Sequence, residues 1–160
     1  MNSYHVRRTE KEITEHALLV ELLRTGRWLT LALSTGNRPY AVAINYGYDA
    51  DRNCLYMHCA ENGRKMDMIR TNTACCASIV QDLGYKNGKC DHGFRSLIIH
   101  GTVTEVLDYE EIRHGLTVLI RHLEPDPEPL LTRLIPNPDS AAGVTILRLD
   151  IRHVTGKENS

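Results

Sequence analysis

The sequence lacks a charge excess of either sign and lacks any long apolar run. It carries 19 lysines and arginines against 20 aspartates and glutamates. Such a balance provides no general basic field for nucleic acid, so any anion site has to be local. No apolar stretch approaches the roughly 18 residues of a membrane span, and the opening residues, MNSYHVRRTEKEI, contain no signal-peptide core. We therefore expect a cytoplasmic protein without nucleic-acid or membrane partners.

The cysteines form no recognisable metal or disulfide pattern. There are five, an odd number, no CxxC occurs, and no pair has zinc-finger spacing. This usage indicates reduced thiols that serve as small buried hydrophobic residues, and it predicts no metal site.

Internal repeats and low-complexity segments are also absent, and the only proline-rich stretch, residues 125–129, is too short to separate domains. A chain of 160 residues is long enough to bury a proper core without disulfides. We predict a single domain that spans residues 1–160.

What the sequence does contain is a series of short alternating segments that are separated by turn residues. The leucines of residues 15–25 form one apolar stripe, which predicts a helix that ends at Gly26. Further helices are predicted over 63–71, over 109–123 with a capping box from Asp108 to Glu111, and over 129–135. Six strands are predicted, over residues 28–34, 40–48, 54–59, 73–83, 94–107 and 143–154, with a turn over 35–37 and a hairpin loop over 84–93. Mostly hairpin-linked strands favour a mainly β fold with flanking helices, in which an antiparallel sheet closes into a barrel.

The segment HCAENGRKMDMIR, residues 58–70, is the best candidate for a binding site. Gly63 lets a ligand approach the backbone at a helix start, Arg64 offers a bidentate fork, and Lys65 adds a second charge, all of which suit a phosphate. The alternative is a solvated helix face. His58 could hydrogen-bond a flat heteroaromatic group or move a proton, whereas Cys59 is more typical of a packing residue.

Three further polar positions are weaker candidates. Asn45 interrupts an apolar strand, which indicates a specific partner for its amide. Tyr46 could line a pocket or face the core, and Ser96 could contact a ligand or simply end a turn.

Taken in order, the segments RPYAVAINYGYD, LYMHCAENGRKMDMIRTN, FRSLIIHGTVTEV and LRLDIRHVTGK resemble the FMN-binding split-barrel superfamily, which includes pyridoxamine 5'-phosphate oxidases. Within it, the chain is most similar to the nitroimidazole-resistance (Nim-type) branch, over residues 6–157. The resemblance implies a six-stranded antiparallel split barrel and a homodimer with FMN in two interface clefts. The C-terminal arginine and tryptophan or histidine groups of the oxidases have no counterpart here, which argues against vitamin B6 oxidation.

The resemblance also implies which residues hold the cofactor. The backbone of one strand would run beside the isoalloxazine ring, His58 and Cys59 would face the flavin, Gly63, Arg64 and Lys65 would hold its phosphate, and Ser96 would reach the flavin of the second subunit. The strand residues concerned are Val42, Ala43, Ile44, Asn45 and Tyr46.

The function expected from these features is an FMN-dependent oxidoreductase. The reduced flavin would pass electrons to a small flat acceptor, nitroaromatic or quinone-like, with His58 as the catalytic residue. The alternatives are a flavin-binding protein that stores or senses FMN without turnover, and a haem- or deazaflavin-binding split barrel.

Overall fold

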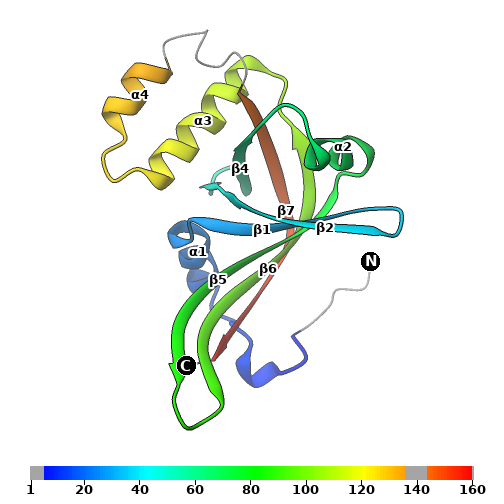
Figure 1. The fold of residues 1–160 in the computed structure, drawn as a ribbon. Helices are drawn as coiled ribbons and strands as arrows, with labels where there is room; N and C mark the ends of the chain where they lie inside the picture. The colour runs from blue at the N-terminus through cyan, green and yellow to red at the C-terminus, as the bar shows by residue number, and fades with distance from the viewer. Residues whose placement is uncertain (1–5, 136–143, 160) are drawn as a thin grey trace.

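The computed structural model describes residues 6–135 and 144–159, which form one antiparallel sheet with helices around it (Figure 1). The strands are β1 (Trp28–Thr35), β2 (Arg38–Asn45), β3 (Gly47–Asp49), β4 (Cys54–Cys59), β5 (Ala74–Lys86), β6 (Asp91–Glu105) and β7 (Thr145–Asn159). The helices are the 3-10 turn η1 (Thr9–Lys11), α1 (His16–Thr25), α2 (Arg64–Thr71), α3 (Tyr109–Leu123) and α4 (Glu128–Leu134). None of the helices described is long and apolar enough to cross a membrane.

The sheet has seven strands in the order β2-β1-β5-β6-β7-β4-β3, and it is not closed, because no pairing joins β2 to β3 among the described residues. The prediction of six strands in a closed barrel was therefore wrong in strand count and in closure. The antiparallel pairing and the flanking helices were predicted correctly. Gly143, the first residue of the last predicted strand, lies outside the described residues.

The extra strand arises because the predicted strand over residues 40–48 breaks at Tyr46. The Tyr46 side chain is fully buried, and its hydroxyl donates a 2.9 Å hydrogen bond to the carbonyl of Leu23 in α1. Gly47 then passes directly against α3, where an added Cβ would lie 2.9 Å from the Cα of Leu119. These two contacts carry the chain from one edge of the sheet at β2 to the other edge at β3.

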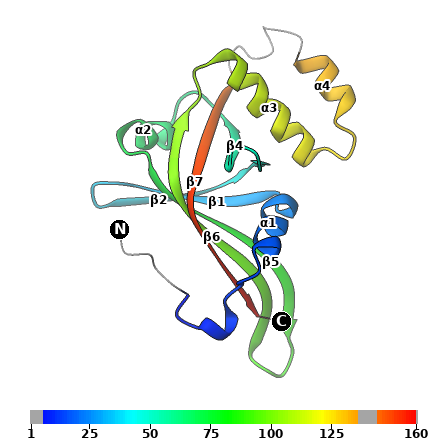
Figure 2. The ribbon, with the colours of Figure 1, turned by 180° about the vertical axis from the view of Figure 1, so that it is seen from behind.

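The β5–β6 hairpin is longer than its glycines suggest. Residues 84–93 were predicted as a loop, but strand pairing continues to Lys86 and Asp91, so that only four residues form the turn. Gly84 instead lies at an irregularity in the strand, where its N–H donates to Asp82 Oδ1 at 2.7 Å. β7 likewise extends beyond its predicted end to pair with β6 as far as Asn159. The hairpin thus projects from the body of the molecule, as both ribbon views show (Figures 1 and 2).

The core lies on one face of the sheet, as the alternation in β1 predicts. Leu29, Leu31 and Leu33 are buried among residues of β4, β5, β6 and β7, and α1 and α2 cover this core. A second, smaller cluster around Tyr56 and Leu119 holds α3 against β4 and β7. The predicted helix boundaries are close to those observed, and the N–H of Glu111 donates to Asp108 Oδ1 at 2.9 Å. The capping box is nevertheless only half formed, because the carboxylate of Glu111 binds elsewhere.

Candidate functional site

An apolar cavity of about 500 Å³ lies between the ends of β1, β2 and β4 on one side and the α3–α4 hairpin on the other. Its lining is mostly leucine, isoleucine, valine and tryptophan, with few polar groups. The lining residues are Trp28, Ala43, Ile44, Asn45, His58, Leu116, Leu119, Ile120, Leu123, Glu124, Leu130, Leu134 and Val144. Four predicted site residues, Ala43, Ile44, Asn45 and His58, are therefore brought together here.

The end of β4 sends its last two side chains in opposite directions. His58 is exposed to the cavity, whereas Cys59 is buried with its Sγ 3.7 Å from Met66 Sδ. Burial raises the pKa of the Cys59 thiol, although the nearby Lys65 ammonium partly opposes this effect. A thiol in that environment is not poised as a nucleophile. His58 is thus the residue of this pair that can reach a ligand in the cavity.

The strand β2 reaches the cavity with its last residues and forms an edge of the sheet. The Asn45 amide donates a 2.9 Å hydrogen bond to the carbonyl of Arg27, so the specific partner expected for it is a backbone group. Tyr46 is buried and turned toward α1, and burial raises its pKa well above the ordinary value. The side chain of Tyr46 is therefore not available to a ligand, and only its backbone remains for such a contact.

The two cations at the start of α2, Arg64 and Lys65, lie in different surroundings in the structure. Gly63 precedes the helix with a φ of +127°, a conformation that favours glycine. The Arg64 guanidinium lies 4.9 Å from the centre of the Tyr40 ring and lines a recess of about 430 Å³ with Arg38, to which Asp67 contributes one acidic side chain. Lys65 instead lies near Cys59. The second cation of the recess is therefore Arg38, which the sequence analysis missed.

Arg38 could not have been found from its local sequence. It follows the β1–β2 turn and comes close to α2 only because that helix packs on β1 and because the Asn72 side chain donates a 2.9 Å hydrogen bond to the Ser34 carbonyl. Trp28 was also missed as a lining residue, although it is 60% exposed at the start of β1. An exposed tryptophan beside an apolar helix pair is the signal that could have indicated it.

Ser96 and Val42 lie apart from the cavity lining. Ser96 is on β6 in a separate recess that the N-terminal segment helps to form. Val42 is half-buried on β2 and packs against the core. Within one chain, the structure thus does not bring Ser96 together with His58, and a contact between Ser96 and the same ligand would require a second subunit.

A polar network fixes α3 over the cavity. His114 Nε2 lies 2.6 Å from Asp49 Oδ2, and Glu111 Oε1 accepts hydrogen bonds from Tyr56 and Arg148, each at 2.9 Å. Burial by itself would raise the pKa of the Asp49 carboxyl, but the hydrogen bonds from His114 and from two backbone N–H groups outweigh it and hold the pKa below its ordinary value. In the part of the chain that is described, no three histidine, cysteine or acidic side chains are placed to hold a metal ion.

We expect Asp49→Asn to lower the free energy of unfolding by about 1–3 kcal/mol at neutral pH, because the charged hydrogen bond to His114 is lost. The pKa of Asp49 is depressed in the folded state. The ionised carboxylate therefore contributes fully to the free energy of unfolding above the ordinary carboxyl pKa of about 4, and this contribution is lost as the pH falls through the lowered pKa. The difference between wild type and variant should therefore shrink in acid. Urea unfolding at neutral pH and near pH 3 measures it, and an equal difference at both would contradict the assignment.

The antiparallel seven-stranded sheet with flanking helices can be compared with known protein families. The family model described as pyridoxamine 5'-phosphate oxidase matches residues 15–158. The chain therefore belongs to the pyridoxamine 5'-phosphate oxidase family, and the family resemblance inferred from the sequence is confirmed.

Solved structures with the same fold include three flavin- or resistance-related proteins. A candidate 5-nitroimidazole antibiotic resistance protein from Bacteroides thetaiotaomicron is 24% identical with a TM-score of 0.74, over 92% of this chain and 86% of its own. An FAD and heme binding protein from Mycobacterium smegmatis is 20% identical with a TM-score of 0.77, and the match covers 94% of this chain and 74% of that protein. An FAD-binding protein from Mesorhizobium loti is 23% identical with a TM-score of 0.66, and the match covers 91% of this chain and 96% of that protein. At these identities the likeness establishes the fold. No curated protein sequence matches the chain significantly.

Proposed function

We propose that this chain is an FMN-binding oxidoreductase that passes electrons from reduced flavin to a small flat acceptor. The observation that carries the proposal is that the free edge of β2 connects the apolar cavity at His58 with the cationic recess at Arg38 and Arg64. An FMN molecule has a flat, largely apolar ring system with a polar edge at one end and a phosphate at the other. The two sites match these two ends.

The strand β2 provides an extended distance between the two sites. The five residue steps from Arg38 to Ala43 span about 17 Å of strand, and arginine side chains reach further. An edge strand also leaves alternate backbone N–H and C=O groups free, which suits the hydrogen-bonding edge of the isoalloxazine ring. The alternating small and exposed residues Ala41 and Ala43 leave room beside that edge.

Each residue would then have a distinct role. Arg38 and Arg64 would bind the phosphate, the β2 backbone would orient the ring, and the apolar residues of α3 and α4 would exclude water. His58 would hold or donate a proton toward the bound acceptor through its exposed imidazole. The flavin, when bound, supplies the two-electron redox chemistry.

The names of similar structures support flavin binding in general, since two of them are described as FAD-binding and one of these as heme-binding. The choice of FMN rests on Arg38 and Arg64, because two guanidinium groups in one recess suit a single terminal phosphate and exceed the one negative charge of Asp67 there. The absorption spectrum of the purified protein, recorded before and after addition of FMN and then of NADH or NADPH, tests the proposal. A bound flavin that bleaches supports the oxidoreductase, and a flavin that stays oxidised favours a storage or sensing protein. A haem band, or no binding of FMN, would contradict it.

We also propose that the chain forms a homodimer through the outward face of β2, β1, β5 and β6. Small side chains cover this face in register: Ala41 pairs with Ala32, Ala32 with Cys76, and Ala43 with Thr30. Ile98, which is 38% exposed, continues the same face on β6. A flat surface of small residues allows close approach of a second sheet.

Ala41→Arg is expected to convert the dimer into a monomer, because a long charged side chain would be forced into the centre of that interface. Size-exclusion chromatography with light scattering measures the mass. A matched arginine at the exposed Thr132 of α4 should leave the dimer intact. A wild-type monomer, or a dimer that survives Ala41→Arg, would show that this face is not the interface.

A further inference from the structure

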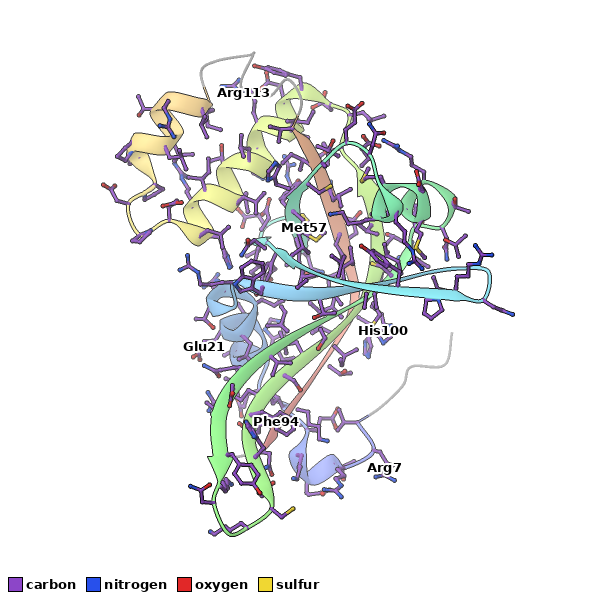
Figure 3. All side chains as sticks on the ribbon, in the orientation of Figure 1. Arg7, Glu21, Met57, Phe94, His100 and Arg113 are labelled. Atoms are coloured by element: carbon purple, nitrogen blue, oxygen red, sulfur yellow. The ribbon has the colours of Figure 1, made fainter. Side chains whose placement is uncertain are left out.

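The helical side of the apolar cavity is formed by α3 and α4, which lie beside β4, the strand that carries Met57 and His58 (Figure 3). The lining residues of α3 recur every three or four positions and therefore form one stripe along the helix, and those of α4 lie one turn apart. They are Leu116, Leu119, Ile120 and Leu123 of α3 and Leu130 and Leu134 of α4. The stripe on α3 spans seven residue steps, or about 10 Å of helix. The cavity thus has a continuous aliphatic wall.

Part of this aliphatic wall is not used to hold the helices in place. On α4 the buried residue is Leu131, which does not line the cavity, whereas Leu130 and Leu134 are half-buried and do line it. Leucine side chains that face an open cavity are in contact with water, and an aliphatic group in the cavity would remove this contact. Such burial strengthens binding by about fourfold for each methylene. The wall therefore favours a ligand with an aliphatic substituent.

The charged and polar groups of the cavity favour an uncharged ligand. No lysine or arginine is among the lining residues that the structure describes, and the carboxylate that lines the cavity belongs to Glu124, which is exposed at the end of α3. Arg27 lies outside the lining, and its guanidinium donates to the carbonyl of Leu123. An anionic ligand would therefore lose hydration without gaining a cation. On the strand side, the exposed ring of His58 can donate a hydrogen bond to a carbonyl oxygen.

We propose that this cavity binds an uncharged quinone that carries an aliphatic side chain, with a quinone oxygen at His58 and the chain along the wall of α3 and α4. The binding uses residues of the cavity and does not require the flavin. That the quinone is also the electron acceptor rests on the proposed oxidoreductase function. In that reaction the quinone takes up two electrons and two protons from FMNH2 and becomes the hydroquinone, and FMN is formed again.

The fluorescence of Trp28 measures this binding, because Trp28 lines the cavity and is the only tryptophan of the chain. The full chain, without added flavin, is titrated with 2-methyl-1,4-naphthoquinone, with its 2-hexyl analogue and with the anionic 2-sulfonate. The dissociation constant of the hexyl compound should be at least about tenfold lower than that of the methyl compound, which is the gain expected from two buried methylenes. The sulfonate should bind at least about tenfold more weakly than the methyl compound, because the cavity offers it no cation.

Replacing Leu130 and Leu134 together with glutamine should remove most of the gain from the hexyl chain, so that the methyl and hexyl compounds differ by less than about threefold. The matched control replaces Leu83 and Leu107 with glutamine, because both leucines are exposed and neither lines the cavity. The control should retain the full gain, which separates binding at the wall from non-specific partition of the longer chain. Thermal unfolding shows whether the variants are folded, and the series of three quinones in the unmodified chain needs no substitution.

The proposal would be overturned if none of the quinones bound, or if the methyl and hexyl compounds had equal dissociation constants in the unmodified chain. Binding of the sulfonate as tightly as the methyl compound would also contradict it, as would an equal loss of the gain in the control variant. The proposed flavin function fails separately. A chain that binds the hexyl compound as expected but does not bind FMN keeps the quinone site and loses the oxidoreductase. A chain that binds FMN but shows no effect of chain length loses only the quinone site.

Discussion

Replacing Arg38 and Arg64 together with glutamine is expected to weaken FMN binding by about two to four orders of magnitude. Both guanidinium groups line one recess beside α2, and each charge-assisted contact to a phosphate contributes about 1.5–3 kcal/mol. The loss should be specific to the phosphate, so the affinity for riboflavin, which has the same ring but no phosphate, should change little. Fluorescence titration of both flavins into wild type and variant measures the two affinities.

The adjacent cation provides a matched control for this prediction. Lys65 follows Arg64 in the sequence but lies near Cys59 instead of in the recess. Lys65→Gln should therefore affect FMN binding much less than Arg38→Gln does. If Lys65→Gln had the larger effect, or if riboflavin affinity fell as much as FMN affinity, the phosphate would be bound elsewhere.

Replacing His58 with glutamine is expected to lower the rate of acceptor reduction by about two to four orders of magnitude while flavin remains bound. A positioned histidine contributes about this much as a general acid or base, and His58 is the histidine exposed to the apolar cavity. Within residues 6–135 and 144–159 the His58 side chain forms no hydrogen bond or ion pair, so the variant should remain stable. Stopped-flow oxidation of the reduced protein by a quinone or a nitroaromatic compound measures the rate.

A second histidine serves as the control. His92 lies at the far end of the β5–β6 hairpin, where its Nε2 is 2.7 Å from Asp82, and His92→Gln should leave the rate unchanged. The pH dependence of the rate separates a chemical role from a steric one, because removal of a proton donor should abolish one limb of the profile. An unchanged rate in His58→Gln would show that this residue only lines the cavity.

The outcome at β2 and β3 shows why the strand count was wrong. Residues 40–48 are apolar except for Asn45 and Gly47, and nothing local marks Tyr46 as the point at which the strand ends. The chain turns there because the Tyr46 hydroxyl meets a carbonyl of α1 and because Gly47 fits against the backbone of α3. Both partners are distant in sequence, so local periodicity could not indicate them. The loop predicted over residues 84–93 was too long because the prediction assigned Gly84 to a turn. In the structure Gly84 lies at an irregularity inside a paired strand.

The candidate site also combines features that the local sequence predicts with features that only the tertiary structure brings together. Sequence alone determined the class of fold, the exposed His58 at the end of a strand, and a glycine followed by Arg64 at the start of α2, because each depends on local spacing and conformation. Tertiary structure decided which cations share a recess: Arg38 joins Arg64 through packing of α2 on β1, and Lys65 turns away. It also decided that the segment before α1 lies beside β7, where the N–H of Ile13 donates a hydrogen bond to the carbonyl of Gly156. Periodicity acts between residues a few positions apart, whereas a binding site is made by contacts between distant segments.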